Sequence, residues 1–147
     1  MSDFAKLLEK LRRVEALHAR TDVTGEREAA AQALDAIRAQ LASFEKRDPA
    51  VEFKFSMPDS WGRRLFVALL RRYGIQPYRY RGQRYTTVMA RVPKSFVDET
   101  LWPEFMELDD TLRQYLSEVT DRVIQEAIFH DVSETPVHAK PGRIEKR

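Results

Sequence analysis

Apolar residues recur every three or four positions through residues 3–46, and this spacing constrains the fold more than any other feature of the chain. In the first run, over residues 3–18, the apolar residues are Phe4, Leu7, Leu8, Leu11, Val14 and Leu17. The second run, at about 25–46, is rich in alanine and keeps the same spacing. Each run is typical of an amphipathic helix, and the short break between them predicts an antiparallel helical hairpin over residues 1–47.

The next part of the chain mixes the periods of strands and helices. Residues 51–55 alternate between apolar and polar, which predicts a strand with one buried face. Residues 58–73 return to helical spacing. Two extended runs, 75–80 and 84–92, then flank Gly82 and predict a β-hairpin.

A final helix is predicted to begin near Ser95 or, after a kink, at Pro103, and to run to about Ile128. These elements define an α+β fold class, in which the helical hairpin precedes a β-α-β-β-α two-layer module over residues 51–131. We expect a three-stranded sheet with helices on one face and a long C-terminal helix. The tail, 132–147, is basic and without periodicity, and it is predicted to be disordered.

The small net charge of +2 conceals two strongly charged segments. Residues 61–94 carry nine basic side chains and no acidic one, whereas residues 98–134 carry eleven acidic and two basic side chains. Like charges within one segment repel unless an opposite charge lies nearby. The basic segment therefore faces either the acidic segment, within the chain or across a dimer, or an anionic partner, and the sequence leaves both open.

The basic segment contains the tyrosines of the predicted β-hairpin. A two-residue loop at Gly82-Gln83 would pair Tyr80 with Tyr85 and Tyr78 with Thr87, and paired side chains share a face. One face would then hold Tyr78, Tyr80, Tyr85, Thr87, Met89 and Arg91. Aromatic rings beside arginines are typical of surfaces that bind single-stranded nucleic acid, because bases stack on the rings while guanidinium groups meet phosphates.

This pattern predicts a surface that binds DNA or RNA, as single strands rather than duplexes. The predicted contacts are the tyrosines and arginines of the hairpin, followed by the arginines of the preceding helix: Tyr78, Tyr80, Tyr85, Arg79, Arg81, Arg84, Arg91, Arg63, Arg64, Arg71 and Arg72. The alternative is that the tyrosine face packs beneath the helical hairpin or against a second subunit. A turn longer by one residue would move every side chain to the opposite face.

The final predicted helix carries a near-heptad apolar seam. Its members are Leu101, Phe105, Leu108, Leu112, Tyr115, Val119 and Val123. Such a seam is typical either of a helix packed across the sheet or of a coiled coil. We expect its C-terminal half to need burial by the helical hairpin or by a second copy of the chain. A homodimer is therefore predicted. The competing functional class is a protein–protein adaptor or homo-oligomeric assembly subunit, in which the basic segment pairs with the acidic helix.

The chain offers little for catalysis. It has no cysteine, its five glycines form neither a P-loop nor a dinucleotide fingerprint, and no serine lies in a nucleophile elbow. Its histidines, His18, His130 and His138, lack the spacing of metal ligands. We therefore expect a non-enzymatic protein without metal or cofactor. No apolar run approaches the roughly 20 residues that span a bilayer, and the N-terminus lacks an apolar leader, so a cytoplasmic location without a membrane partner is expected.

Three short motifs lie in the predicted helical hairpin, at Lys6–Leu11, Glu15–His18 and Thr24–Ala30. A fourth begins at Trp61 and ends at Tyr73-Gly74. Together they resemble a domain-of-unknown-function family of bacteria and phages, in which an alanine-rich helical hairpin precedes a tryptophan-started helix and a β-hairpin. The resemblance covers about residues 5–92. It implies this order of elements and a bacterial or phage setting, and it implies no activity or site residue.

Overall fold

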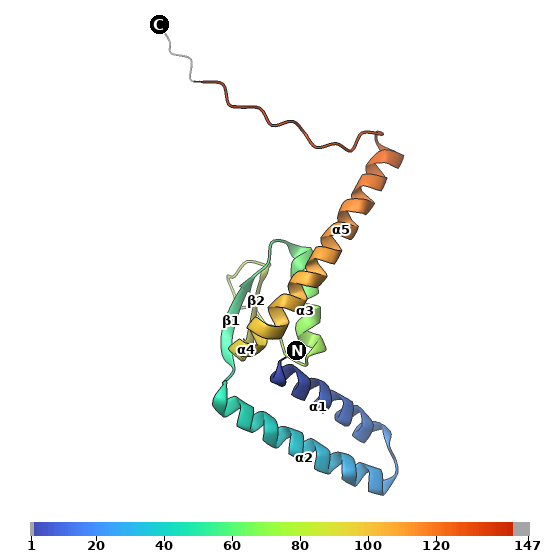
Figure 1. The fold of residues 1–147 in the computed structure, drawn as a ribbon, viewed down its shortest axis with the longest axis vertical. Coiled ribbons are helices and arrows are strands. Elements are labelled where there is room, and N and C mark those ends of the chain that lie inside the picture. The colour runs from blue at the N-terminus through green and yellow to red at the C-terminus, as the bar shows by residue number, and fades with distance from the viewer. Residues whose placement is uncertain (1, 143–147) are drawn as a thin grey trace. The chain divides into compact units, whose positions relative to one another are not determined.

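The structure, a computed structural model, describes residues 2–142 (Figure 1). In chain order its elements are α1 (Asp3–Arg20), α2 (Thr24–Arg47), β1 (Val51–Ser56), α3 (Ser60–Arg72), β2 (Thr87–Val92), α4 (Lys94–Phe96), a π-helical turn η1 (Val97–Leu101) and α5 (Trp102–Ala127). The α+β fold class, the N-terminal helical hairpin and the long C-terminal helix are thus confirmed. The chain divides into two compact units, Met1–Asp110 and Thr111–Arg147, with the boundary inside α5.

The first two helices form the predicted hairpin, and Figure 1 shows α1 and α2 side by side. The Ser2 hydroxyl begins α1 as its N-cap, accepting a hydrogen bond from the Ala5 amide at 3.2 Å. Phe4 joins the hairpin to the rest of its unit, since its ring lies 5.4 Å from that of Phe44 in α2 and 5.1 Å from that of Phe96 in α4. These ring contacts bring the start of the chain onto the core.

The expected three-stranded sheet is wrong, because the sheet of the described residues has two antiparallel strands, β1 and β2. The run 75–80 touches β2 through a single bridge between Tyr78 and Met89. Two local features explain this. The Ile75 amide still donates to the Leu70 carbonyl of α3, and Pro77 has no amide proton with which to extend a ladder.

The predicted register of the hairpin is also wrong. Tyr78 pairs with Met89 rather than with Thr87, a shift of two residues that leaves the alternation of faces unchanged. The connection is longer than two residues, because the Gln83 amide closes one turn on the Tyr80 carbonyl and the Thr87 amide closes a second on the Arg84 carbonyl. The inward face of β2 is as expected, since Val88, Ala90 and Val92 are buried.

The core lies between the sheet and the helices that follow each strand. Its fully buried side chains include Phe66 and Leu70 of α3, together with Phe96 and Leu101. Phe105 of α5 meets Phe66 edge to face, with ring centres 5.3 Å apart. The prediction that residues 51–55 form a strand with one buried face is confirmed, because Phe55 is buried whereas its neighbours Lys54 and Ser56 are exposed.

Both predicted starts of the last helix are present in the structure. Helical backbone begins at Lys94, and the π-helical turn η1 then leads into α5. Pro103 is the second residue of α5, and its missing amide proton removes one backbone hydrogen bond next to η1. The predicted kink is therefore a π-helical turn.

Beyond α5, no helix or strand is formed by the described residues up to Gly142. The rest of the tail that was expected to be disordered, residues 143–147, lies outside the described residues. Among residues 2–142, no helix is both long enough and apolar enough to cross a membrane.

Candidate nucleic-acid interface

The loop that carries the predicted contacts is held by its own residues. In the turn Tyr80–Gln83, Gly82 occupies the third position with φ +88°, a backbone conformation that glycine adopts without strain. The Gln83 side chain fixes this turn, since its Oε1 accepts from the Tyr80 amide at 2.8 Å and its Nε2 lies 3.4 Å from the Met89 sulfur. The loop is therefore anchored on β2.

Tyr78 and Tyr80 share one acceptor. Both phenol hydroxyls donate to the Glu52 carboxylate of β1, and the two rings meet edge to face with centres 5.7 Å apart. Because β2 separates Glu52 from the run 75–80 in the sheet, these side chains reach across β2. Met89, in the middle of β2, is only 5% exposed, which agrees with side chains lying over this part of the strand.

This shared acceptor changes the titration of all three groups. The hydrogen bonds from Tyr78 and then Tyr80 lower the pKa of Glu52 below its usual value. The same carboxylate raises the pKa of Tyr78 to about 12 and also raises the pKa of Tyr80. Both hydroxyls therefore donate to a carboxylate of the same chain. The Tyr80 side chain nevertheless remains 51% exposed.

Tyr85 forms a second, separate cluster with two arginines. The Arg63 guanidinium carbon lies 4.3 Å from the centre of the Tyr85 ring, and its Nη1 donates to the Tyr85 hydroxyl at 3.3 Å. Arg79 approaches the same ring, with its guanidinium carbon 5.5 Å from the centre. Tyr85 is nevertheless 54% exposed. Ring and guanidinium planes of this kind are both surfaces on which a base can stack.

The structure disperses the other predicted contacts. Arg91 lies opposite Glu52 in the sheet register, and Arg81 is exposed in the loop. Arg64 lies over Trp61, with its guanidinium carbon 5.6 Å from the ring centre. The remaining ones, Arg71 and Arg84, line separate pockets. The surface therefore consists of two tyrosine clusters with arginines around them, rather than one continuous face.

Arg72 lies apart from this surface. Its guanidinium forms an ion pair with Glu104 of α5 at 2.7 Å, and Tyr73 donates to the other oxygen of that carboxylate at 2.5 Å. Burial, and then this hydrogen bond, hold the pKa of Tyr73 well above its usual value. Arg72 therefore joins the basic segment to the acidic residues at the start of α5.

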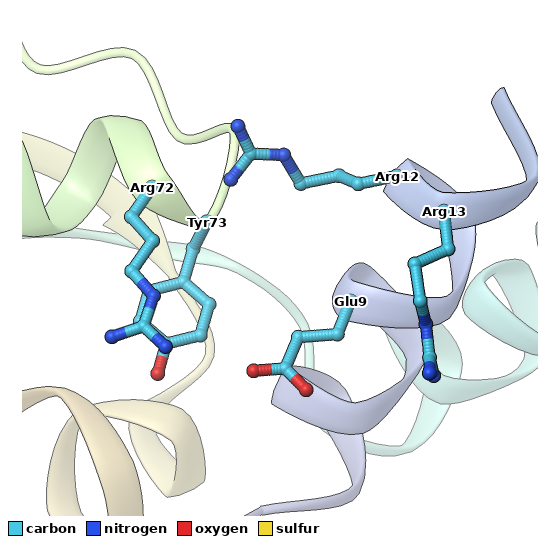
Figure 2. A pocket seen from close by; sticks show the side chains of 5 residues that line it. All are labelled: Glu9, Arg12, Arg13, Arg72 and Tyr73. Carbon is cyan, nitrogen blue, oxygen red and sulfur yellow. The ribbon is translucent and has the colours of Figure 1, made fainter. Parts of the chain in front are cut away.

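Arg72 and Tyr73 also line a pocket of about 280 Å³ together with three residues of α1: Glu9, Arg12 and Arg13. Figure 2 shows Glu9 and Arg12 extending from α1 toward Tyr73. Sequence reasoning missed this group because about sixty residues separate its two halves along the chain.

Sequence reasoning also missed a polar pocket beside the loop, of about 380 Å³. Its lining residues are Lys54, Ser56, Gly82, Gln83, Arg84 and Thr87. The alternation of β1 was the available signal, because it places Lys54 and Ser56 on the outer face beside the predicted hairpin.

In comparisons with protein-family models, curated proteins and solved structures, nothing matches this chain. The resemblance of residues 5–92 to the bacterial and phage family therefore stays a prediction. Among the described residues, no group of three or more histidine, cysteine, aspartate or glutamate side chains is arranged to hold a metal ion.

Proposed function

We propose that this chain is a small, non-enzymatic protein that binds single-stranded DNA or RNA through its basic segment. The observation that carries the proposal is the Tyr85 cluster, in which an aromatic ring more than half exposed lies beside the guanidinium groups of Arg63 and Arg79. A strand can stack one base on this cluster while neighbouring phosphates meet the arginines. The exposed half of Tyr80 offers a second ring.

The charge around these rings supports an anionic partner outside the chain. Within the unit Met1–Asp110, Arg72 forms an ion pair with Glu104 and Arg91 lies opposite Glu52 in the sheet register, whereas Arg63 and Arg79 lie against the Tyr85 ring. The exposure of Tyr80 and Tyr85 also argues against their burial beneath the helical hairpin. Arginines beside exposed rings supply both parts of single-strand recognition, electrostatic attraction and stacking.

The test is fluorescence anisotropy with labelled oligothymidine and its RNA counterpart, each of about twelve nucleotides, at about 50 mM salt. We expect Tyr85→Ala to weaken binding by about fivefold or more, because stacking contributes roughly 1–3 kcal/mol per base. The control is Leu17→Ala, which removes an exposed apolar side chain of α1, away from both candidate surfaces. Equal losses in both variants, or none in either, would contradict the proposed role of Tyr85.

A second candidate function is self-association through the C-terminal half of α5. Its observation is the exposed apolar surface over residues 115–129, where Tyr115, Val123, Ile128 and Phe129 are all more than half exposed. Exposed apolar side chains gathered near one another in the sequence, here in α5 and just after it, are a feature of protein–protein interfaces. Light scattering at micromolar concentration distinguishes a homodimer from a monomer of 17.2 kDa, and a monomeric mass would remove this candidate. The cytoplasmic location stays a prediction.

A further inference from the structure

The polar pocket beside the loop combines positive charge with hydroxyl donors. Lys54 and Ser56 come from β1, Thr87 from β2, and Gly82, Gln83 and Arg84 from the loop. Two of these six residues are cationic and none is acidic. A site of this composition favours an anion with several acceptor oxygens.

The polar groups of the pocket are not used elsewhere in the described part of the chain. Among residues 2–142, the side chains of Lys54, Ser56, Arg84 and Thr87 form no hydrogen bond or ion pair with another residue. Thr87 is the most informative, because it is only 5% exposed and yet lines the pocket. Its hydroxyl is not among the fully buried polar atoms without a partner in the described residues, so it can donate to an oxygen bound in the pocket.

Hydrogen bonds within the chain hold two residues that line the pocket. The Gln83 side chain is held by the Tyr80 amide and by Met89, and the Thr87 amide is held by the Arg84 carbonyl. A volume of about 380 Å³ exceeds one phosphate and leaves room for the attached sugar.

We propose that this pocket binds one phosphate group of the single strand, with Lys54 and Arg84 as its cations and Ser56 and Thr87 as hydrogen-bond donors. The inference rests on the proposed function and extends it to β1, which sequence reasoning left out of the interface. It places a phosphate beside Gly82, Gln83 and Arg84, in the loop that follows Tyr80.

The experiment compares the double variant Lys54→Gln/Arg84→Gln with the wild type. The matched control is Arg27→Gln/Lys46→Gln, which removes the same charges from exposed positions of α2. Binding of labelled oligothymidine is measured across a salt series. One phosphate contact contributes about 0.7 to the slope of log affinity against log salt for a single strand. We expect the slope of the pocket variant to be shallower by about 0.7, and that of the control to equal the wild type.

A second arm identifies the source of the phosphate. The amide signals of Gly82, Gln83 and Thr87 are followed by nuclear magnetic resonance while either oligothymidine or inorganic phosphate is added. We expect the strand to shift them at a concentration far below that of inorganic phosphate. If inorganic phosphate shifts them and the strand does not, the pocket serves a free anion and the proposal is overturned.

The outcomes separate the two proposals. If wild type and control fail to bind the strand, the proposed function fails and the pocket proposal fails with it. If the wild type binds and the pocket variant keeps its affinity and salt slope, the proposed function stands and the phosphate site is wrong.

Discussion

Glu52 accepts hydrogen bonds from two of the tyrosines predicted to contact nucleic acid, although nothing in its sequence position indicates this. The contacts from Tyr78 and Tyr80 span 26 and 28 residues, and they depend on a bridge between Tyr78 and Met89 that propensity alone does not specify. The alternation of residues 51–55 predicted that Glu52 faces outward, and it does. It could not predict which side chains would cross β2 to reach it.

The first prediction concerns the tyrosine titration. Because the folded-state pKa of Tyr78 is about 12, above its ordinary 10.0, the hydrogen bond stabilises the fold fully below pH 10.0 and less as the pH rises toward 12. In Glu52→Gln the charged acceptor is gone, so we expect the pKa of Tyr78 to fall toward 10.0. We also expect the variant to lose less stability than the wild type between pH 10.0 and pH 12. Ultraviolet absorbance titration and thermal unfolding between these pH values measure both, and an unchanged titration would contradict the assignment.

A second prediction at this scale concerns Tyr73. Its ring is 2% exposed and its hydroxyl donates to Glu104, which also pairs with Arg72. Tyr73→Phe keeps the ring and removes this bond, so we expect the free energy of unfolding to fall by about 1.5–3 kcal/mol, the usual value for a hydrogen bond to a charged group. Denaturant unfolding measures the change. Tyr115→Phe, at an exposed position, is the control, with an expected change below about 0.5 kcal/mol.

At the scale of elements, periodicity predicted the helices well and the middle strand badly. The spacing of apolar residues identified α1, α2, α3 and α5, because each carries apolar residues at helical spacing along its own sequence. The run 75–80 has the composition of a strand, yet Pro77 and the hydrogen bond from Ile75 to α3 limit its pairing to Tyr78. Pairing of that kind depends on the neighbouring element, which composition does not describe.

The start of α3 gives a prediction for an element boundary. Asp59 is its N-cap, with the side chain accepting from the Gly62 amide at 2.9 Å. We expect Asp59→Ala to lower the free energy of unfolding by about 1 kcal/mol. Asp22→Ala, in the exposed connection between α1 and α2, is the control, and equal effects of the two substitutions on denaturant unfolding would contradict the role of the cap.

The loop gives a prediction about backbone conformation. Gly82 has φ +88°, and a Cβ there would meet no atom within 4 Å, so the cost of Gly82→Ala is conformational alone. We expect a loss of about 1–2 kcal/mol in unfolding free energy. Gly25→Ala, at a helical position with no such φ, is expected to be neutral or slightly stabilising. Similar melting temperatures for the two variants would contradict the turn.

At the scale of the whole molecule, the distribution of charge says more than its sum. The net charge of +2 arises from a basic segment beside an acidic one, and the sequence left open whether they meet. In the unit Met1–Asp110 they meet at Arg72 and Glu104. The Arg72–Glu104 contact depends on tertiary packing. The spacing of residues in the sequence predicts which side chains share a face of a helix or strand, but not which distant segments lie close together.

The measurement that tests the central claim most directly is the affinity of the full chain for labelled single-stranded DNA and RNA across a salt series. We expect binding at about 50 mM salt that weakens steadily as salt rises, with a log–log slope steeper than about −2, as for three or more neutralised phosphates. Absence of binding at about 50 mM salt, or an affinity that does not change with salt, would contradict the account.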